Sequence, residues 1–394
     1  MSGPSRVIRA VAIRTGVLSR PNPRTDAVFM WRLRPLPFDA LSGWAEDDHA
    51  AALRTFSRHA NRPAGESYRC GTIGITPESL EPLFERATEP AALADPRGFF
   101  EAHFDCCALV GSDRERGFVT AFYEPRIGVS RTRTERFREP FYRRPDDLVP
   151  VTSENRPSGW DEAWRFARRA ADGTLLHYPD RAAIDAGWLE GRGLEIAWAE
   201  DPVDVFFAHV QGAARLEFVD GGETRVTYDG KNGHAFTAIG RLLVDRGEID
   251  PTSVSMTAIR RWLADHPGEA RQVMQENRSY IFFRETSVAD EADGPVAAAK
   301  VPLTANRSLA VDRLLHTFGS PVFVTADRVN GRPWRRLMIA QDTGSAIVGP
   351  ARGDLFMGSG DEAGARAAAV RSAADFCLLV PKSLHLPAGM EIGP

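Results

Sequence analysis

The sequence predicts a two-domain protein of mixed strands and helices, with a small β-barrel near its C-terminal end. The chain has 394 residues, more than one hydrophobic core usually serves, so two domains are expected. From Val301 onward, short apolar segments alternate with turn residues, a spacing typical of the strands of a small barrel. Hydrophobic residues make up 43% of the chain and charged residues 26%, which is ordinary for a globular protein.

The N-terminal quarter is predicted to form a tail followed by helices. Its first 25 residues contain arginines and no acid, so residues 1–37 are expected to form a tail without fixed structure. A helix is expected from Phe38 to Arg62, because acidic residues precede an apolar face there. Pro77 opens a second helix. A third is expected from Ala91 to Phe104.

The middle of the chain mixes strands and helices. Gly117–Tyr123 is β-branched and aromatic, which predicts a strand. The apolar run Val203–Val210 predicts a short buried strand. Ala214–Val219 and Thr224–Tyr228 flank two glycines, which is typical of a β-hairpin.

Two helices and then the barrel strands are expected further along. Apolar residues at helical spacing predict a helix from Phe236 with Gly247 near its C-cap. A second helix is expected to be capped by Thr252 and to carry Met256 through Leu263. The C-terminal strands are expected at Ser308–Val311, Pro321–Thr325, Leu337–Ala340 and Phe376–Val380.

Composition excludes several classes of function. The formal net charge is −4, so no nucleic-acid partner is expected. No stretch approaches the ~20 apolar residues of a membrane span, and the N-terminus shows neither a signal-peptide core nor a lipidation cysteine. The four cysteines and nine histidines lack the spacings of metal sites, so we expect no metal and no cofactor.

The strongest local candidate for chemistry is a pair of aspartates. Asp342 and Asp354 flank a glycine-bearing turn region, and glycine lets the backbone approach a ligand closely. Leu355 and Phe356 could place Asp354 beside an apolar wall, and burial there raises the pKa of a carboxylic acid toward that of a general acid. From composition and spacing alone, two plain Asx-turn residues are the favoured interpretation.

Two histidines have both a chemical and a structural interpretation. His234 follows Lys231-Asn232-Gly233 and could do acid–base work. A turn that starts the next helix, with Asn232 near its N-cap, is the favoured interpretation. His209 lies in an apolar run, which predicts a satisfied core residue rather than a ligand.

Several motifs resemble those of the membrane-bound lytic transglycosylase A (MltA) family. QDTGSAIVGPARGDLFMGSG, residues 341–360, resembles its C-terminal barrel motif. GFVTAFYEP, residues 117–125, resembles its strand ending in Tyr-x-Pro. Further similar segments are DPVDVFFAHVQG (201–212), YDGKNGHAFTAIGRLLVDRG (228–247) and VPLTANRSLAVDR (301–313). They occur in the family's order, which is more specific than any one match.

The resemblance implies a fold and a reaction. The fold would be mainly β with α: a double-psi β-barrel domain, residues 38–125 plus 287–394, built from both chain ends. A β-rich second domain, residues 126–286, would be inserted, with the substrate cleft between the two. Members of the family cleave the MurNAc–GlcNAc β-1,4 bond of peptidoglycan and leave 1,6-anhydro-MurNAc ends.

Carried over by position, the family's catalytic aspartate falls on Asp354 and its supporting aspartate on Asp342. The expected glycan-binding positions are Thr120, Tyr123, Gln211, Ala213, Asn232 and Gly344. Many members have serine where this chain has Ala213, so one polar contact with the glycan is expected to be missing.

The expected function is therefore lytic transglycosylation in cell wall turnover, with Asp354 as acid and then base and no cofactor. Two alternatives remain open: a hydrolase on the same barrel, with Asp342 activating water, and a non-catalytic wall-binding protein. The expected partners are peptidoglycan glycan strands and other cell-wall enzymes, the protein being a monomer. The resemblance implies a periplasmic or cell-envelope location.

Overall fold

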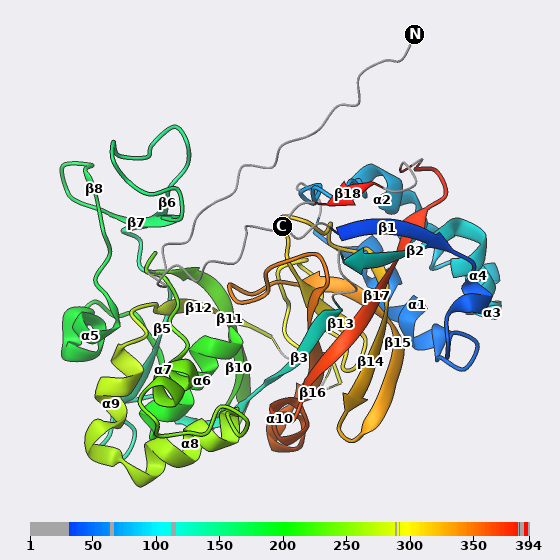
Figure 1. Ribbon diagram of the computed structural model, residues 1–394. Coiled ribbons are helices and arrows are strands. Elements are labelled where there is room, and N and C mark those ends of the chain that lie inside the picture. Colours follow the sequence, from blue (N-terminus) through cyan, green and yellow to red (C-terminus); the bar gives the residue numbers. More distant parts are fainter. Residues whose placement is uncertain are drawn as a thin grey trace, which may run out of the picture. The chain divides into compact units, whose positions relative to one another are not determined.

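The computed structural model describes residues 31–63, 67–111, 116–287, 290, 292–384, 386 and 390–392 (Figure 1). The chain forms two compact units. The first consists of Met1–Val119, Leu309–Gly353 and Ser372–Pro394, and the second of Thr120–Ser308 and Asp354–Arg371. The domain boundaries expected at residues 125/126 and 286/287 stay predictions.

A closed barrel organises the first unit. Six strands have residues in this unit and are hydrogen-bonded in the order β14-β15-β13-β16-β3-β17, and β14 also pairs with β17, so the sheet closes. The barrel that the C-terminal apolar segments predicted is thereby confirmed. The strands are β3 (Gly117–Glu124), β13 (Ser308–Val311), β14 (Pro321–Val329), β15 (Arg332–Asp342), β16 (Arg352–Ser359) and β17 (Arg371–Pro381).

Three further strands extend the sheet past β17. β2 (Phe104–Gly111) pairs with β17, β1 (Trp31–Leu36) with β2, and β18 (Glu391–Ile392) with β1. The presence of β1 corrects the predicted tail over residues 1–37, because Trp31 and Leu33 alternate into the core and their strand runs antiparallel to β2. Residues 1–30 of that tail lie outside the described residues.

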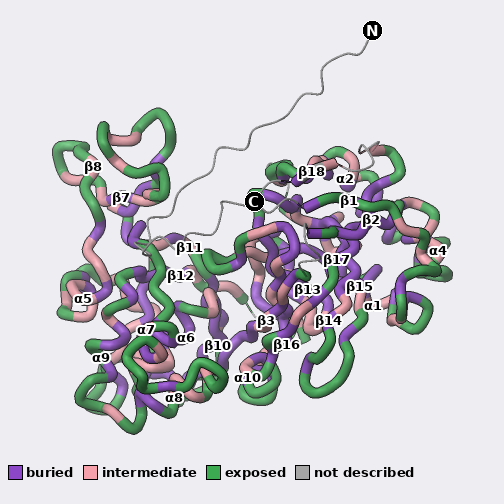
Figure 2. Tube along the Cα trace, viewed as in Figure 1, coloured by how far each residue is buried: buried purple, intermediate pink, exposed green. Residues whose placement is uncertain are grey.

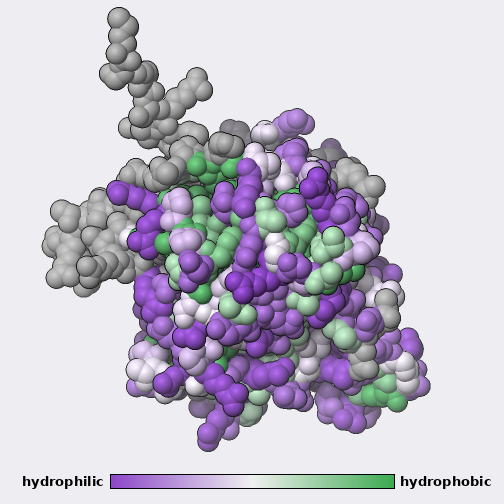
Figure 3. Space-filling model, turned by 90° about the vertical axis from the view of Figure 1, so that its right-hand side faces the viewer, coloured by the Kyte–Doolittle hydropathy of each residue, from purple (hydrophilic) through white to green (hydrophobic). Residues whose placement is uncertain are grey.

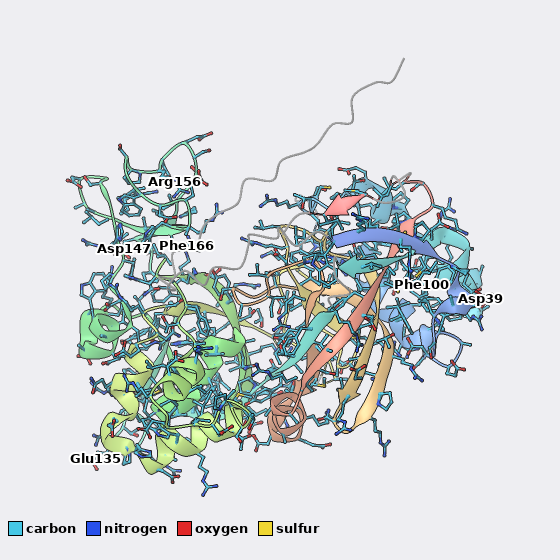
Figure 4. The ribbon with its side chains drawn as sticks, viewed as in Figure 1. Asp39, Phe100, Glu135, Asp147, Arg156 and Phe166 are labelled. Carbon is cyan, nitrogen blue, oxygen red and sulfur yellow. The ribbon has the colours of Figure 1, made fainter. Side chains whose placement is uncertain are left out.

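The helices of the first unit are shorter than the sequence pattern predicted. Phe38–Arg62 contains α1 (His49–Ser57) between two 3₁₀ turns, and the Asp48 side chain caps α1 by accepting from Ala51 N at 2.9 Å. α2 (Pro77–Arg86) begins at the predicted proline. The third helix divides at Asp95 into α3 (Pro90–Ala94) and α4 (Pro96–His103), because Asp95 leaves the helical conformation. Phe100 of α4 is labelled in Figure 4.

The second unit contains a six-stranded sheet in the order β12-β11-β10-β4-β9-β5. The predicted hairpin is confirmed as β10 (Ala213–Phe218) and β11 (Glu223–Lys231). Gly221 and Gly222 join them with φ of 98° and 83°, a conformation that favours glycine. The other strands are β4 (Arg126–Ser130), β5 (Glu139–Tyr142), β9 (Glu195–Ala199) and β12 (Ile281–Thr286).

A small three-stranded sheet belongs to the same unit. It consists of β6 (Leu148–Pro150), β7 (Phe166–Arg169) and β8 (Leu175–Leu176). Asp147, labelled in Figure 4, precedes it and accepts from the Tyr178 hydroxyl at 3.1 Å and from Arg192 Nη2 at 2.9 Å. α5 (Arg181–Ala183) and a π-helical turn, η4 (Ile184–Trp188), follow.

The strand predicted over Val203–Val210 is wrong, because this run lies in helix α6 (Pro202–Gln211). The Asp201 side chain accepts from Val203 N at 2.8 Å, Pro202 occupies the first turn, and Gly212 ends the helix in the left-handed region. The sequence pattern of this helix resembles that of a buried strand because the helix is apolar on two sides. Val205 and Ala208 join the core of the sheet, while Phe206 and Phe207 join a core formed by helices.

The remaining helices differ at their ends from those predicted. α7 (Ile239–Asp245) begins three residues after Phe236, so Asn232 is not near its N-cap. Gly247 has φ of 78° just after α7, as the C-cap prediction required. α8 (Met256–Asp265) is capped by Ser255, whose Oγ accepts from Ala258 N at 3.2 Å, and not by Thr252. α9 (Pro267–Gln275) was not predicted, although Pro267 opens it.

Burial follows this arrangement. The barrel strands and the central strands of the six-stranded sheet are mostly buried along their length, and exposed residues concentrate in connections and on outer helix faces (Figure 2). The face in Figure 3 is largely hydrophilic, with hydrophobic residues gathered in small patches. None of the described helices is long and apolar enough to cross a membrane.

Candidate active site

Strand β16 presents Asp354 next to a buried apolar run. Asp354 is half-buried, while Leu355, Phe356 and Met357 after it are at most 1% exposed. Gly353 before it sits so close to its neighbours that an added Cβ would lie 2.9 Å from the Leu309 side chain. The strand is therefore tightly packed at Gly353, while Asp354 is only half-buried.

The structure brings Thr120 and Asp354 together. Thr120 lies on β3, which is adjacent to β16 in the sheet, and its hydroxyl donates a hydrogen bond to Asp354 Oδ1. A hydroxyl that donates to a carboxylate favours the charged form and fixes its orientation. Both residues were expected at the site, and this contact joins them in one constellation.

An aromatic pair lies two residues further along the same two strands. The rings of Phe122 and Phe356 have centroids 5.2 Å apart and are buried. This pair lies near the Thr120–Asp354 hydrogen bond, in agreement with the expected apolar wall beside Asp354.

Tyr123 and Gln211 are also brought together. Tyr123 N donates to Gln211 Oε1 at 3.1 Å, so the last residue of α6 is tied to β3. Burial raises the pKa of the Tyr123 hydroxyl. The Tyr123 ring packs on Gly364 of α10 (Gly360–Ala368), where an added Cβ would lie 2.7 Å from the ring.

A buried ionic cluster follows at the end of β3, and the sequence pattern did not predict it. Glu124 is 1% exposed and accepts from Arg225 Nε at 2.5 Å, from Arg225 Nη2 at 3.2 Å and from Ser359 Oγ at 2.5 Å. Arg215 Nη2 lies 3.7 Å from the same carboxylate. Glu124 thus ties the end of β3 to the end of β16, the two strands that carry Thr120 and Asp354. An acid in an otherwise apolar strand was the only signal available.

Two residues that were expected to bind glycan, Asn232 and Ala213, are buried in the protein interior. Asn232 is fully buried, and its amide donates to the carbonyls of Pro179 and Arg278 at 3.0 and 2.9 Å and accepts from Tyr280 N at 3.0 Å. Ala213 is buried where β10 begins. Their contact with a glycan stays a prediction. His234 is buried too, and its Nε2 bonds the Tyr178 carbonyl at 2.8 Å.

Asp342 and Gly344 belong to the first unit. Asp342 is half-buried at the end of β15, and Gly344 is exposed in the turn after it, where its carbonyl accepts from Ile347 N at 2.9 Å. The preceding Gln341 is buried and donates to Thr55 O at 3.3 Å and to His59 Nε2 at 3.1 Å. These contacts anchor the strand end from which Asp342 projects.

Within the described residues, no group of three or more His, Cys, Asp or Glu side chains is placed to hold a metal ion. At Asp354 a half-buried carboxyl group lies beside a hydroxyl that donates to it and is followed in the chain by buried apolar residues. A barrel with an inserted unit of sheet and helices that carries such a group defines a protein suited to carboxylate acid–base chemistry.

Comparison with known proteins agrees with this class. Residues 118–284 match the family model described as the MltA specific insert domain, and residues 307–380 match the 3D domain. The chain is 33% identical over 283 residues to the membrane-bound lytic murein transglycosylase A of Escherichia coli K12, covering 69% of this chain and 68% of that one. The Vibrio cholerae enzyme of the same name is 29% identical over 297 residues, 73% of this chain and 72% of that one.

Solved structures are similar over more of the chain. The membrane-bound lytic murein transglycosylase of Agrobacterium tumefaciens has a TM-score of 0.82 and 50% identity, covering 89% of this chain and 98% of that one. MltA from Neisseria gonorrhoeae has a TM-score of 0.74 and 30% identity, covering 94% of this chain and 98% of that one. E. coli MltA with bound chitohexaose has a TM-score of 0.63 and 25% identity, covering 92% of this chain and 95% of that one. This protein belongs to the membrane-bound lytic murein transglycosylase A family.

Proposed function

We propose that the protein is a lytic murein transglycosylase that cleaves the glycan strands of peptidoglycan. The observation that carries the proposal is the Thr120–Asp354 hydrogen bond between adjacent strands, in a chain that belongs to this family. The E. coli relative was solved with bound chitohexaose, a glycan, which supports a glycan strand as the ligand here.

Asp354 is the proposed acid and base. As an acid, its carboxyl group would protonate the O4 leaving atom as the bond from C1 of MurNAc to O4 of GlcNAc breaks. As a base, the resulting carboxylate would take the proton of the MurNAc C6 hydroxyl while the oxygen of that hydroxyl bonds to C1. One carboxyl group suffices, because the sugar supplies its own nucleophile, whereas most glycosidases need a second carboxylate for that step.

The surroundings of Asp354 support this assignment. Thr120 holds one carboxyl oxygen in a fixed position. The buried Phe122–Phe356 pair lowers the local polarity beside the group. Asp342 is proposed as a supporting carboxylate that orients substrate, and Tyr123 and Gln211 as residues that line the glycan path.

The mass of the product tests the proposal. Attack by the C6 hydroxyl gives a 1,6-anhydro-MurNAc end, whereas attack by water gives a reducing end that is heavier by one water molecule. Purified protein is incubated with peptidoglycan, and the fragments are weighed by mass spectrometry. Anhydro ends are expected, since a well-placed internal hydroxyl can have an effective molarity of ~10⁵ M or more.

Other products would indicate other functions. Reducing ends as the main product would make the protein a hydrolase on the same barrel. Binding without cleavage would make it a wall-binding protein. The relatives are named as membrane-bound murein enzymes, so we infer a location in the cell envelope and, more finely, the periplasm. Action as a monomer alongside other cell-wall enzymes is part of the proposal.

A further inference from the structure

The second unit contains a polar cavity that the proposed glycan chemistry does not use. Its volume is about 240 Å³, and β5, η4, α6, α9 and Tyr280 contribute to its walls. None of its lining residues is among those proposed above for glycan binding or catalysis. Sites for drug-sized ligands usually measure ~300–1,000 Å³, so this cavity suits a smaller molecule.

One lining residue, His209, has an unused hydrogen-bond donor. His209 is 7% exposed, and its Nδ1 lies 3.1 Å from Arg181 Nη1. A guanidinium can only donate, so Nδ1 is the acceptor and the neutral ring carries its proton on Nε2. Burial, together with the nearby Arg181 charge, lowers the pKa of His209 well below its usual value, which keeps the ring neutral.

Nε2 of His209 is buried without a hydrogen-bond partner among the described residues. The sequence pattern predicted a satisfied core histidine at this position, and that prediction is wrong for this one atom. A buried donor without an acceptor is unfavourable. A ligand oxygen would satisfy it, so the cavity favours a molecule that brings an acceptor to His209.

Arg181 makes the same region of the cavity positive. It is 3% exposed, and its Nε and Nη2 donate to the carbonyls of Asn277 and Ser279 at 2.9 and 2.7 Å. With His209 as the third acceptor, all three hydrogen-bond partners are neutral, and the opposite charge that acts on Arg181 from nearby is that of Asp185. A buried guanidinium that hydrogen-bonds only neutral groups attracts an anion, so the acceptor best suited to this region is a carboxylate.

A carboxylate of the protein lines the cavity as well. Asp185 lies on the π-helical turn η4, and Gln275 Nε2 donates to its Oδ2 at 3.2 Å. Burial raises the pKa of Asp185, although Arg181 acts in the opposite direction. A cation beside Asp185 would compensate its buried charge. π-Helical turns are rare and frequently occur at functional sites.

The remaining charges around the cavity are already partly paired. Arg271 bonds Glu139 at 2.6 Å, and Arg133 lies 3.8 Å from Glu190. Arg138 donates from Nε to the carbonyl of Glu135, labelled in Figure 4, at 2.6 Å. The cavity therefore offers charges of both signs, and Arg181 and Asp185, although each acts electrostatically on the other, hydrogen-bond to neutral groups.

We propose that this cavity binds a small zwitterion of the amino-acid or dipeptide type, with its carboxylate toward His209 and Arg181 and its ammonium group toward Asp185. Such a ligand has two sources: a free amino acid or dipeptide, and the end of a short peptide attached to a glycan strand. The site is separate from Asp354 and does not depend on the proposed cleavage reaction.

Calorimetric titration of the full chain with D-alanyl-D-alanine tests the proposal. Binding is expected, and N-acetylation of the ammonium group and amidation of the carboxylate are each expected to weaken it at least tenfold. No heat of binding at millimolar dipeptide would overturn the proposal. So would equal binding of all three compounds, because the charged ends would then make no contribution.

Variants locate the site. Asp185→Asn and His209→Phe are each expected to weaken dipeptide binding about tenfold, while Glu162→Gln, an exposed acid in the same unit, leaves it unchanged. If His209→Phe fails to fold, the binding of the dipeptide to Asp185→Asn and the binding of the modified dipeptides to the natural chain still test the proposal. Unchanged binding to Asp185→Asn would overturn the assignment. Asp354→Asn is expected to bind the dipeptide as the natural chain does, so a failure of the cleavage mechanism leaves this test intact.

Competition identifies the source of the ligand. A glycan fragment that carries its peptide is titrated against bound D-alanyl-D-alanine, with the peptide-free fragment as control. Displacement by the first fragment alone assigns the site to peptides on glycan strands. No displacement by either assigns it to free zwitterions. Equal displacement by both fragments would overturn the proposal, because sugar would then be what the cavity binds.

Discussion

The hydroxyl of Thr120, on the adjacent strand, anchors one carboxyl oxygen of Asp354. Such an anchor suits a group that must first give up and then take back a proton, because the carboxyl group keeps its position between the two steps. Substitutions of Asp354 and of Thr120 are therefore expected to have different effects on glycan binding, on the cleavage rate and on its pH dependence.

Asp354→Asn should abolish glycan cleavage and leave glycan binding largely intact. The amide has nearly the same shape but cannot donate and regain the proton, and general acid–base groups typically contribute ~10²–10⁴-fold in rate. Cleavage is measured by release of soluble fragments and binding by co-sedimentation with peptidoglycan. Glu362→Gln, an exposed residue of α10, is the matched control. Undiminished cleavage by Asp354→Asn would remove Asp354 from the mechanism.

Thr120→Val should lower the cleavage rate by about 10- to 100-fold, because a hydrogen bond to a charged group contributes ~1.5–3 kcal/mol. The pH optimum should also move upward, since that hydrogen bond favours the charged form of Asp354. Rate profiles against pH measure both effects. Thr120→Ser keeps the hydroxyl and should restore most of the rate. A pH profile identical to that of the natural chain would show that the contact is only structural.

The sequence could predict part of this site. Asp354 and Thr120 were expected from the family resemblance, since both lie within matching motifs. Glu124 could not be assigned a partner, because its partners Arg225 and Ser359 lie 101 and 235 positions away in the chain. Only the folded strands bring these residues together.

Helix α6 shows why elements are harder to predict than motifs. Its apolar residues face two cores, one of the sheet and one of helices, so no single apolar stripe marks it as a helix. The signals at its ends were present, since Asp201-Pro202 opens it and Gly212 closes it. Capping residues were thus more informative here than periodicity. Five of the six barrel strands were found at least in part, because each contains a short apolar or β-branched run bounded by turns, whereas β16 was not predicted as a strand.

Asp201→Ala should destabilise the protein by ~0.5–2 kcal/mol, the usual effect of removing an N-cap side chain. The Asp201 carboxylate accepts from Val203 N, and alanine leaves that donor without its acceptor. Urea unfolding monitored by tryptophan fluorescence measures the loss. Asp146→Ala, at an exposed position of the same unit, should be neutral. Equal stability of the two variants would contradict the capping role.

Glu124→Gln should destabilise the second unit by ~3–5 kcal/mol, because it leaves Arg225 and Arg215 buried beside a neutral group. Both arginines are at most 3% exposed, so water cannot replace the lost charge. Thermal unfolding compares this variant with Ser359→Ala, which removes one hydrogen bond and should cost only ~0.5–1.5 kcal/mol. A larger loss for Ser359→Ala than for Glu124→Gln would refute the charge argument.

For the molecule as a whole, buried histidines set the response to acid. Burial, with a smaller contribution from Arg62, lowers the pKa of His59 to about 3, whereas an unfolded histidine titrates near 6.5. Between these values the unfolded chain binds a proton that the folded chain does not, so stability falls as pH falls. Burial lowers the pKa of His209 and His316 as well.

His59→Phe should reduce this dependence on pH. Below pH 6.5 the natural chain should lose ~1.4 kcal/mol more stability per pH unit than the variant. Phenylalanine preserves the stacking on Phe84, whose ring lies 4.8 Å from that of His59. The test compares the slope of the unfolding free energy against pH, between pH 6.5 and 5, for the natural chain and the variant. A loss of stability that is the same at every pH does not change this slope. Equal slopes would mean that His59 is protonated in the folded state.

The pairing of β2 with β17 also bears on how the chain is made. Ala108 pairs with Cys377, so a ribosome adds about 270 residues (377 − 108 = 269) from the first of these paired residues to the second. At roughly 5–20 residues per second, β2 spends on the order of 15–50 s with one strand edge open, while the long segment in between can already fold. An open edge is a template for wrong pairing. The newborn chain is therefore most exposed to aggregation late in translation, and occupation of that edge by a chaperone would protect it until β17 emerges.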